Sequence, residues 1–285
     1  NNNDGVVDNV YVLYAGKGEA DGGSETTIWP HQWDIYSAEK LTCKLDGKSI
    51  RAYACSAELN GSNKCAMGTP LHEFGHVIGL PDYYDTQYES TNYSQARTPG
   101  EWSIMDAGSY NNDGNTPPNY SIFDKYFLGW ATPKFLAKDE VKNVTMTTDW
   151  DDAYQINGGS SLVAATNTNT VYYIENRQKS GWDAYLPGHG MIVWQVKYNA
   201  TNWEDNDLNN TGGSPRYTVL SASGDPTNIG KATDPFPGTN TVRTFKPFTG
   251  CELTEITESS GNINFKYNGG IEKTEWDYVL AGENC

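Results

Sequence analysis

The segment His72-Glu73-Phe74-Gly75-His76 constrains the fold of this chain more than any other feature. It has the pattern H-E-x-x-H. Thr69 suits a helix N-cap, Pro70 suits the first helical position, and Gly79 suits a left-handed stop, so one short helix is predicted through the motif. Side chains four positions apart lie on one face of a helix, about one turn apart, so the two imidazoles can bind one metal ion.

Two residues downstream extend this motif. Gly79 allows a sharp turn, and Asp82, three residues later, is predicted to swing back as a third ligand beside His72 and His76. Met105 follows 23 residues after Asp82 in Ser-Ile-Met-Asp, which fits a Met-turn, a tight turn that places a methionine beneath a metal site. The order and spacing predict a zinc site.

Glu73 is the predicted general base and acid. A carboxylate beside the two histidines can take a proton from a metal-activated water and later pass one to the leaving amine of a peptide. Tyr110, five residues after Met105, is a candidate for stabilising the oxyanion, although packing is the commoner role of a tyrosine. The pattern therefore favours peptide-bond hydrolysis in a protein or peptide substrate.

The remainder of the chain predicts an α+β fold of two parts. Residues 6–14 form a β-rich apolar run, and the two segments flanking Asp46-Gly47 predict a hairpin. A second helix is predicted from Ser121 to about Gly129. Alternating patterns predict strands at 170–175, 190–197, 216–221 and 263–267. We place a boundary near 135, between a catalytic domain at 1–135 and a β-rich, sandwich-like region at 136–285.

Charge and hydropathy exclude several classes of protein. With 20 basic and 36 acidic residues the net charge is -16, which argues against binding to nucleic acid or anionic lipid. No apolar run approaches the roughly 20 residues of a membrane-spanning helix. The chain begins at Asn1 with neither an initiator methionine nor a signal segment, so we expect a processed form or a fragment.

The chain is rich in Asn, Thr, Gly and Tyr and poor in Lys, which is typical of an exported protein, where disulfides between its five cysteines would persist. A bond from Cys55 to Cys65 would close a short loop, and buried free thiols are the alternative.

Weaker patterns could bind calcium. Asn2, Asp4 and Asp8 fit part of a D-x-N-x-D-G calcium loop, although the acidic residue expected at its twelfth position is Tyr11. An ordinary turn is the default for this segment. Residues 204–207, Glu-Asp-Asn-Asp, could also hold calcium, but such runs are usually solvated loops.

His31 and His189 have no spacing to a metal-binding partner, which favours structural hydrogen bonding over a role in a substrate cleft.

The chain resembles the metzincin metallopeptidases, and more narrowly the secreted bacterial immune inhibitor A family. The resemblance rests on the helix motif with Gly79-Leu80-Pro81-Asp82 and on Trp102-Ser103-Ile104-Met105-Asp106. Further landmarks are Ile28–His31, Tyr126–Trp130, Glu175–Gln178, Gly181–Asp183, Leu186–Gly190 and Asp234–Gly238. The resemblance implies a zinc endopeptidase that is secreted or held at the bacterial cell surface. It also implies a zymogen whose signal and inhibitory pro-segment are absent from this chain, with a β-sandwich region after the catalytic domain.

Three alternatives stay open. In the gluzincin class the third ligand is a glutamate at least about twenty residues downstream, and Glu101 lies 25 residues after His76; Gly79 and Met105 favour Asp82 instead. The chain could also be a non-catalytic glycan- or protein-binding surface protein with a structural zinc, or a protease-derived adhesin. A structural zinc site usually has four protein ligands and needs no glutamate beside the first histidine, whereas Glu73 is present here.

Overall fold

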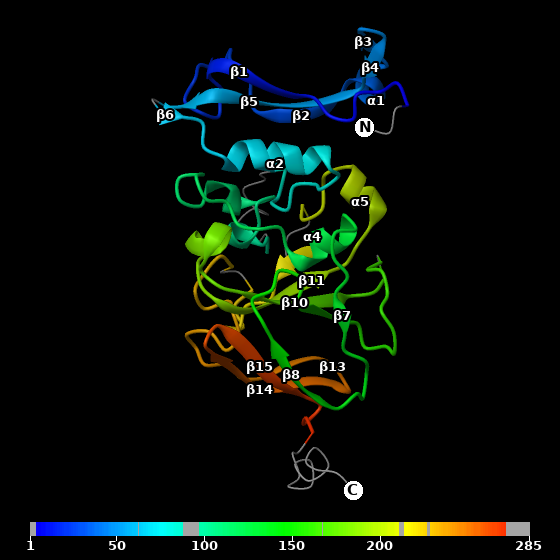
Figure 1. Cartoon of the computed structure of the whole chain (residues 1–285), viewed down its shortest axis with the longest axis vertical. Coiled ribbons are helices and arrows are strands. Elements are labelled where there is room, and N and C mark those ends of the chain that lie inside the picture. Colours follow the sequence, from blue (N-terminus) through cyan, green and yellow to red (C-terminus); the bar gives the residue numbers. More distant parts are fainter. Residues whose placement is uncertain are drawn as a thin grey trace, which may run out of the picture.

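The computed structural model describes residues 4–61, 63–87, 97–166, 168–210, 214–226 and 229–271. Its elements are stacked in layers along the long axis of the molecule (Figure 1). An N-terminal sheet lies at one end, helix α2 (Gly68–Val77) lies against it, and two further sheets follow toward the other end.

Strand β5 is the centre of the N-terminal sheet. It pairs in parallel with β1 on one side and antiparallel with β2 on the other, so β2 is an edge strand. The strands are β1 (Tyr11–Lys17), β2 (His31–Asp34), β5 (Ala52–Asn60) and β6 (Asn63–Lys64). Between β2 and β5 lie helix α1 (Ile35–Glu39) and the hairpin β3 (Cys43–Leu45) to β4 (Lys48–Ile50). Asp46 and Gly47 both have positive φ, which confirms the predicted hairpin turn.

Helix α2 carries the H-E-x-x-H motif, as predicted, but it begins earlier than the sequence suggests. Its first residue is Gly68, so Thr69 lies within the first turn and makes no N-cap. The amide of Gly68 donates to the carbonyl of Gly114, 2.7 Å away. A loop carbonyl therefore satisfies one of the free backbone donors of the first turn. At the other end Gly79 has φ +101°, and the amide of Leu80 donates to the carbonyl of Gly75, which confirms the predicted stop.

The central sheet has five strands and is buried on both faces. Its order is β12-β11-β10-β9-β7. The bounds are β7 (Lys134–Phe135), β9 (Ala153–Ile156), β10 (Val171–Arg177), β11 (Gly190–Val196) and β12 (Tyr217–Val219). Successive residues of β11 alternate between two apolar cores, Trp194 toward the helices and Val193 toward the last sheet, which explains the nearly continuous apolar run.

The last sheet packs against the central one over the second of these cores. Its order is β13-β14-β15-β8, with β8 (Lys142–Met146), β13 (Phe245–Phe248), β14 (Cys251–Ser259) and β15 (Asn262–Tyr267). Leu253 and Phe265 from this sheet meet Ile156 and Val193 from the central sheet. Mixed sheets with few helices confirm the α+β class.

The first core joins both halves of the chain. Met105 and Phe123 share it with Tyr173, Trp194 and Tyr217 of the central sheet. Helix α4 (Ile122–Phe127) begins with a capping box between Ser121 and Asp124, which confirms the second predicted helix. Helix α5 (Ala200–Glu204) and three 3₁₀ turns, η1 (Gly100–Trp102), η2 (Ala107–Tyr110) and η3 (Gly181–Tyr185), complete the described elements. The domain boundary near 135 stays a prediction.

The predicted disulfide between Cys55 and Cys65 is wrong in this structure, where both are free thiols. The amide of Cys65 donates to the carbonyl of Glu58, so Cys65 lies opposite a residue three positions along the strand from Cys55. That offset is roughly 10 Å at the rise of a β-strand, beyond the reach of a disulfide. Cys43 and Cys251 are free as well, and Cys285 lies outside the described residues.

None of the helices in the described ranges has the length and hydropathy that a membrane-spanning helix requires.

Candidate metal centre

Three side chains converge at the C-terminal half of α2. The Nε2 atoms of His72 and His76 lie 3.2 Å apart, and Asp82 Oδ1 lies 3.0 Å from the first and 3.2 Å from the second. Within the described ranges this is the one group of three His, Cys, Asp or Glu side chains whose ligand atoms come together. Ligands at about 2.05 Å from a tetrahedral zinc ion would be about 3.3 Å apart, close to these spacings.

The hydrogen bonds of the two imidazoles show which atoms face the centre. His72 Nδ1 lies 2.9 Å from the carbonyl of Ile104, and His76 Nδ1 lies 2.7 Å from the carbonyl of Leu80. A carbonyl only accepts, so each Nδ1 carries a proton and each ring, when neutral, presents the lone pair of Nε2 to the centre. Asp82 Oδ1 is buried there without a hydrogen-bond donor.

Three lone-pair atoms facing one another within 3.2 Å repel unless a cation lies between them. Burial opposes ionisation of Asp82, but when no metal is bound a protonated imidazole beside it outweighs burial and holds the pKa of that carboxyl well below its usual range. The carboxylate is therefore charged and fits a divalent metal ion. Two imidazoles and one carboxylate are a ligand set that zinc favours, and three protein ligands leave a position open.

Glu73 lies beside this centre. Its side chain is 7% exposed and lines the same cleft as the two histidines. Burial raises the pKa of Glu73, and the nearby imidazoles offset this only in part. A carboxylate with a raised pKa is better matched to accepting and returning a proton near neutral pH than an ordinary surface glutamate.

Met105 packs against helix α2 within the H-E-x-x-H motif. It is fully buried, and a Cβ atom at Gly75 would overlap its sulfur. The second variable position of the motif is thus glycine because the methionine packs against the helix backbone there. The preceding carbonyl, of Ile104, is the one that orients His72, and the amide of Tyr83 donates to the carbonyl of Met105 at 2.8 Å. One turn therefore supports two of the three ligands.

The centre opens into a large cleft. One wall is the stretch from Trp29 to Asp34, which includes edge strand β2, and the other is Tyr84 with residues 203–206. Trp29 is 57% exposed, so aromatic surface is available in this cleft. His31 lies in the wall, hydrogen-bonded to the carbonyl of Trp29 and to the hydroxyl of Tyr53. It therefore has the structural bonding expected from the sequence but also faces the cleft.

Residues 203–210 support the turn that carries Asp82, which the sequence does not indicate. Asn206 Oδ1 accepts from the amide of Asp82 at 2.6 Å, and Asn206 Nδ2 donates to Asp82 Oδ2 at 2.7 Å. Trp203 Nε1 donates to the carbonyl of Gly79 at 2.9 Å. The only sequence signal at this position is a polar residue within an acidic run, which we interpreted as a solvated loop or a calcium site.

The other candidate residues lie elsewhere. Tyr110 is 71% exposed on η2 and does not line the cleft, where Tyr53 and Tyr84 are found instead. Glu101 is exposed on η1, outside the metal-binding group. Asp4 Oδ1 accepts from the amide of Val6, as in an ordinary turn, and Asn2 lies outside the described residues. Calcium binding by Asn2, Asp4 and Asp8 stays a prediction.

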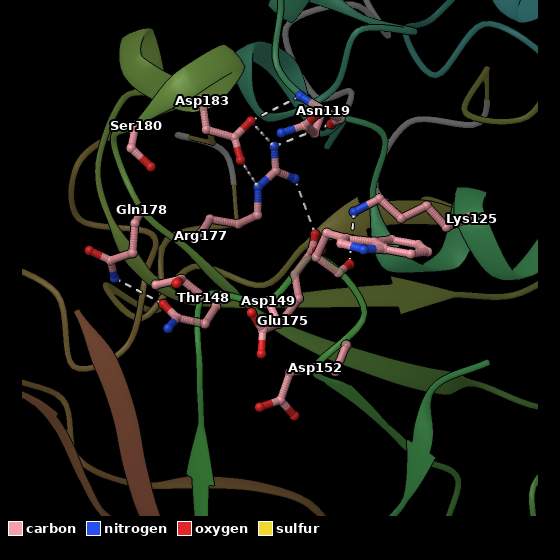
Figure 2. A pocket seen from close by; sticks show the side chains of 13 residues that line it. Asn119, Lys125, Thr148, Asp149, Asp152, Glu175, Arg177, Gln178, Ser180 and Asp183 are labelled. Carbon is pink, nitrogen blue, oxygen red and sulfur yellow. Dashed lines mark hydrogen bonds and ion pairs between the residues drawn. The ribbon is translucent and has the colours of Figure 1, made fainter. Parts of the chain in front are cut away.

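A second pocket lies in the central sheet and has a different character. Figure 2 shows the guanidinium of Arg177 held between Glu175 and Asp183, next to Asn119. Arg177 donates to both oxygens of Asp183 and to one oxygen of Glu175. Each carboxylate is paired with the guanidinium, so we interpret this group as a structural network.

Comparison with known proteins adds an independent observation. Residues 1–132 match "Immune inhibitor A peptidase M6, catalytic domain". This match covers a little under half of the chain, and over these residues the chain is similar to the catalytic domain of that peptidase family. Immune inhibitor A of Bacillus thuringiensis subsp. alesti is 31% identical over 139 residues, covering 45% of this chain and 19% of that protein. Pre-pro-metalloprotease PrtV of Vibrio cholerae serotype O1, strain M66-2, is 32% identical over 133 residues, covering 44% and 14%.

The matched residues include only part of the candidate site. The chain covers less than a fifth of the length of these curated relatives. The family match includes all three candidate ligands, Glu73 and Met105 but ends at residue 132, so Trp203 and Asn206 lie beyond it. Groups from both halves of the chain thus meet at the candidate metal centre.

Proposed function

We propose that this chain is a secreted zinc-dependent endopeptidase with a metzincin-like centre. The observation that carries the proposal is the convergence of His72 Nε2, His76 Nε2 and Asp82 Oδ1 in a cleft that also holds Glu73. The match of residues 1–132 to the catalytic domain of a peptidase family supports it. A relative named a metalloprotease supports the choice of a metal-dependent reaction.

Zinc, when bound by these three residues, would supply positive charge that polarises the scissile carbonyl and makes water a stronger acid. The residues of the chain perform the remaining tasks. Glu73 accepts the proton of the attacking water and returns it to the nitrogen of the leaving amine, so the peptide C–N bond breaks while a C–O bond forms. The carbonyls of Ile104 and Leu80 keep the imidazoles oriented toward the centre throughout.

The cleft suits an extended polypeptide. Strand β2 has one neighbour, β5, among the described strands, and its other edge borders the cleft. Backbone groups at such an edge can pair with a substrate strand of almost any sequence, which is how an endopeptidase can hold the middle of a chain. Exposed Trp29 and Trp33 would add apolar contact for substrate side chains.

Secretion and synthesis as a zymogen belong to the same proposal. The printed name of the Vibrio cholerae relative, "Pre-pro-metalloprotease", describes a pre- and a pro-segment for that protein. We propose that the present chain is likewise made with a pre-segment, which directs its secretion, and a pro-segment, which inhibits it.

The test is the zinc content of the purified chain together with cleavage of unmodified casein. We expect one zinc per chain, cleavage that a zinc chelator abolishes, and recovery of cleavage when zinc is restored. Cleavage that persists after complete removal of zinc would overturn the proposed metal dependence. Bound zinc with no cleavage of casein or of a mixed peptide library would favour a binding protein with a structural zinc.

A further inference from the structure

Asp82 is held at two points by one side chain that lies 124 positions later in the chain. The amide nitrogen of Asp82 donates to Asn206 Oδ1 at 2.6 Å, and Asn206 Nδ2 donates to Asp82 Oδ2 at 2.7 Å. Only one orientation of the carboxamide satisfies both bonds, because the backbone amide needs an acceptor and the carboxylate needs a donor. The pair of bonds fixes the carboxylate relative to its own backbone.

This arrangement assigns the two oxygens of Asp82 different partners. Oδ2 is occupied by the Asn206 amide, whereas Oδ1 faces the two Nε2 atoms and has no hydrogen-bond donor. Asp82 is only 6% exposed, so water could not readily replace the missing donor if Asn206 were lost. The carboxylate would then be free to rotate about its terminal bond, and Oδ1 would leave the centre for part of the time.

Asn206 is itself anchored by its neighbours. Trp203, 7% exposed, packs against Tyr83 with ring centroids 5.9 Å apart and donates to the carbonyl of Gly79. The hydroxyl of Thr86 donates to the carbonyl of Asn206 at 3.0 Å. Asn209 Nδ2 donates to the carbonyl of Tyr83. Four successive contacts therefore align segment 203–209 with segment 79–86.

The identity of residue 206 is significant because its neighbours are acidic. Glu204, Asp205 and Asp207 surround it, yet the residue that contacts Asp82 is the neutral one. A carboxylate at position 206 would be 2.7 Å from that of Asp82 and could not donate to it. An asparagine both donates to the ligand and avoids this repulsion.

We propose that Asn206 is the positioning residue for Asp82, so that the β-rich half of the chain completes a metal centre whose ligands all come from the N-terminal half. The proposal rests on the proposed function in that zinc is the metal concerned. The proposal assigns a role in metal binding to residues 136–285, which lie outside the family match at residues 1–132. A mutation outside the matched region should therefore weaken zinc binding.

The variant Asn206→Asp tests this most directly, because it keeps the shape of the side chain and the acceptor for the Asp82 amide but loses the donor. The matched control is Asn202→Asp in the same segment, whose amide donates to Asp207 at 2.6 Å and not to Asp82. Both variants add one negative charge to the same loop. Asn206→Ala is the second test variant, since it removes the donor without adding charge.

Zinc affinity of the full chain would be measured by competition with a chromogenic chelator, and the visible absorption of the cobalt-substituted protein would report ligand geometry. We expect both Asn206 variants to bind zinc about 10- to 100-fold more weakly than Asn202→Asp, the usual effect of losing an outer partner of a ligand. We also expect an altered cobalt spectrum, with thermal unfolding of the metal-free proteins showing that all variants are folded.

Zinc affinity within twofold of the control, together with an unchanged cobalt spectrum, would overturn the proposal for Asn206. Casein cleavage by the wild type, measured in the same samples, separates this result from the proposed function. A wild type that binds zinc but never cleaves contradicts the peptidase function alone, and a wild type that binds no zinc contradicts both.

Discussion

Arg177 and Asp183 form a bidentate ion pair inside the protein, with Nε 2.8 Å from Oδ2 and Nη2 2.6 Å from Oδ1. The same Asp183 oxygen accepts from the backbone amide of Asn119, and Arg177 Nη2 donates to the carbonyl of Asn119. Asn119 lies between the Met-turn and helix α4. The ion pair thus ties the segment that follows Met105 to the central sheet (Figure 2).

Replacing Arg177 by methionine should therefore destabilise the whole chain. Asp183 is 8% exposed and would keep a buried charge without its partner, which typically costs about 3–5 kcal/mol. The free energy of unfolding from urea titration measures this cost. The control is Lys266→Met, which breaks an exposed pair with Glu255 and should cost less than about 1 kcal/mol. Equal effects of the two substitutions would contradict the structural role of the buried pair.

The same pair predicts part of the acid sensitivity. Burial alone would raise the pKa of Asp183, but Arg177 outweighs it, so the folded pKa lies below the unfolded value of about 3.9. The stability that this carboxylate contributes is full above pH of about 3.9 and is lost as the pH falls through its folded pKa. The stability difference between wild type and Asp183→Asn should shrink below about pH 4, as urea titrations at several pH values would show. A difference that stays constant down to pH 2 would rule this out.

Gly75 should not tolerate alanine without movement of Met105. The added methyl group would overlap the methionine sulfur, and overpacking of this kind costs about 1–3 kcal/mol. Because the Met-turn also orients His72 through the carbonyl of Ile104, zinc affinity should fall as well. A double-mutant cycle with Met105→Ala checks the cause, since alanine at 105 leaves room for the methyl group. Additive costs in that cycle would exclude the overlap as the reason.

Asp82→Ala should abolish zinc retention, whereas Glu101→Ala should preserve it. The structure places Asp82 Oδ1 within 3.2 Å of both imidazoles and leaves Glu101 on an exposed turn outside the group. Metal analysis after dialysis against a weak chelator compares the two variants. Loss of zinc from Glu101→Ala with retention by Asp82→Ala would reverse the assignment of the third ligand.

The parts of the site that could be predicted from sequence are those whose information is local. The histidine spacing, Gly79 and Asp82 all lie within eleven residues, and helix geometry alone brings the two imidazoles together. The hairpin at Asp46-Gly47 and the capping box at Ser121 are local for the same reason. The turn containing Met105 could be predicted because its spacing to the motif is restricted.

Contacts between distant segments could not be predicted in this way. Asn206 reaches Asp82 only because the central sheet brings α5 beside the turn after α2, and nothing within residues 204–207 indicates that contact. The disulfide prediction failed because the pairing of β5 with β6 sets Cys65 opposite Glu58 rather than Cys55. The start of α2 was misplaced because Gly114, 46 positions later, supplies the acceptor that caps Gly68.

The most direct test of the central claim is Glu73→Gln, which keeps the size of the side chain but cannot accept a proton. Zinc content and the rate of casein cleavage would be measured on the same preparation, with the wild type as reference. We predict one zinc per chain and a cleavage rate at least about 100-fold lower, as expected for loss of a general base. Cleavage at the wild-type rate by the zinc-loaded variant would contradict the account.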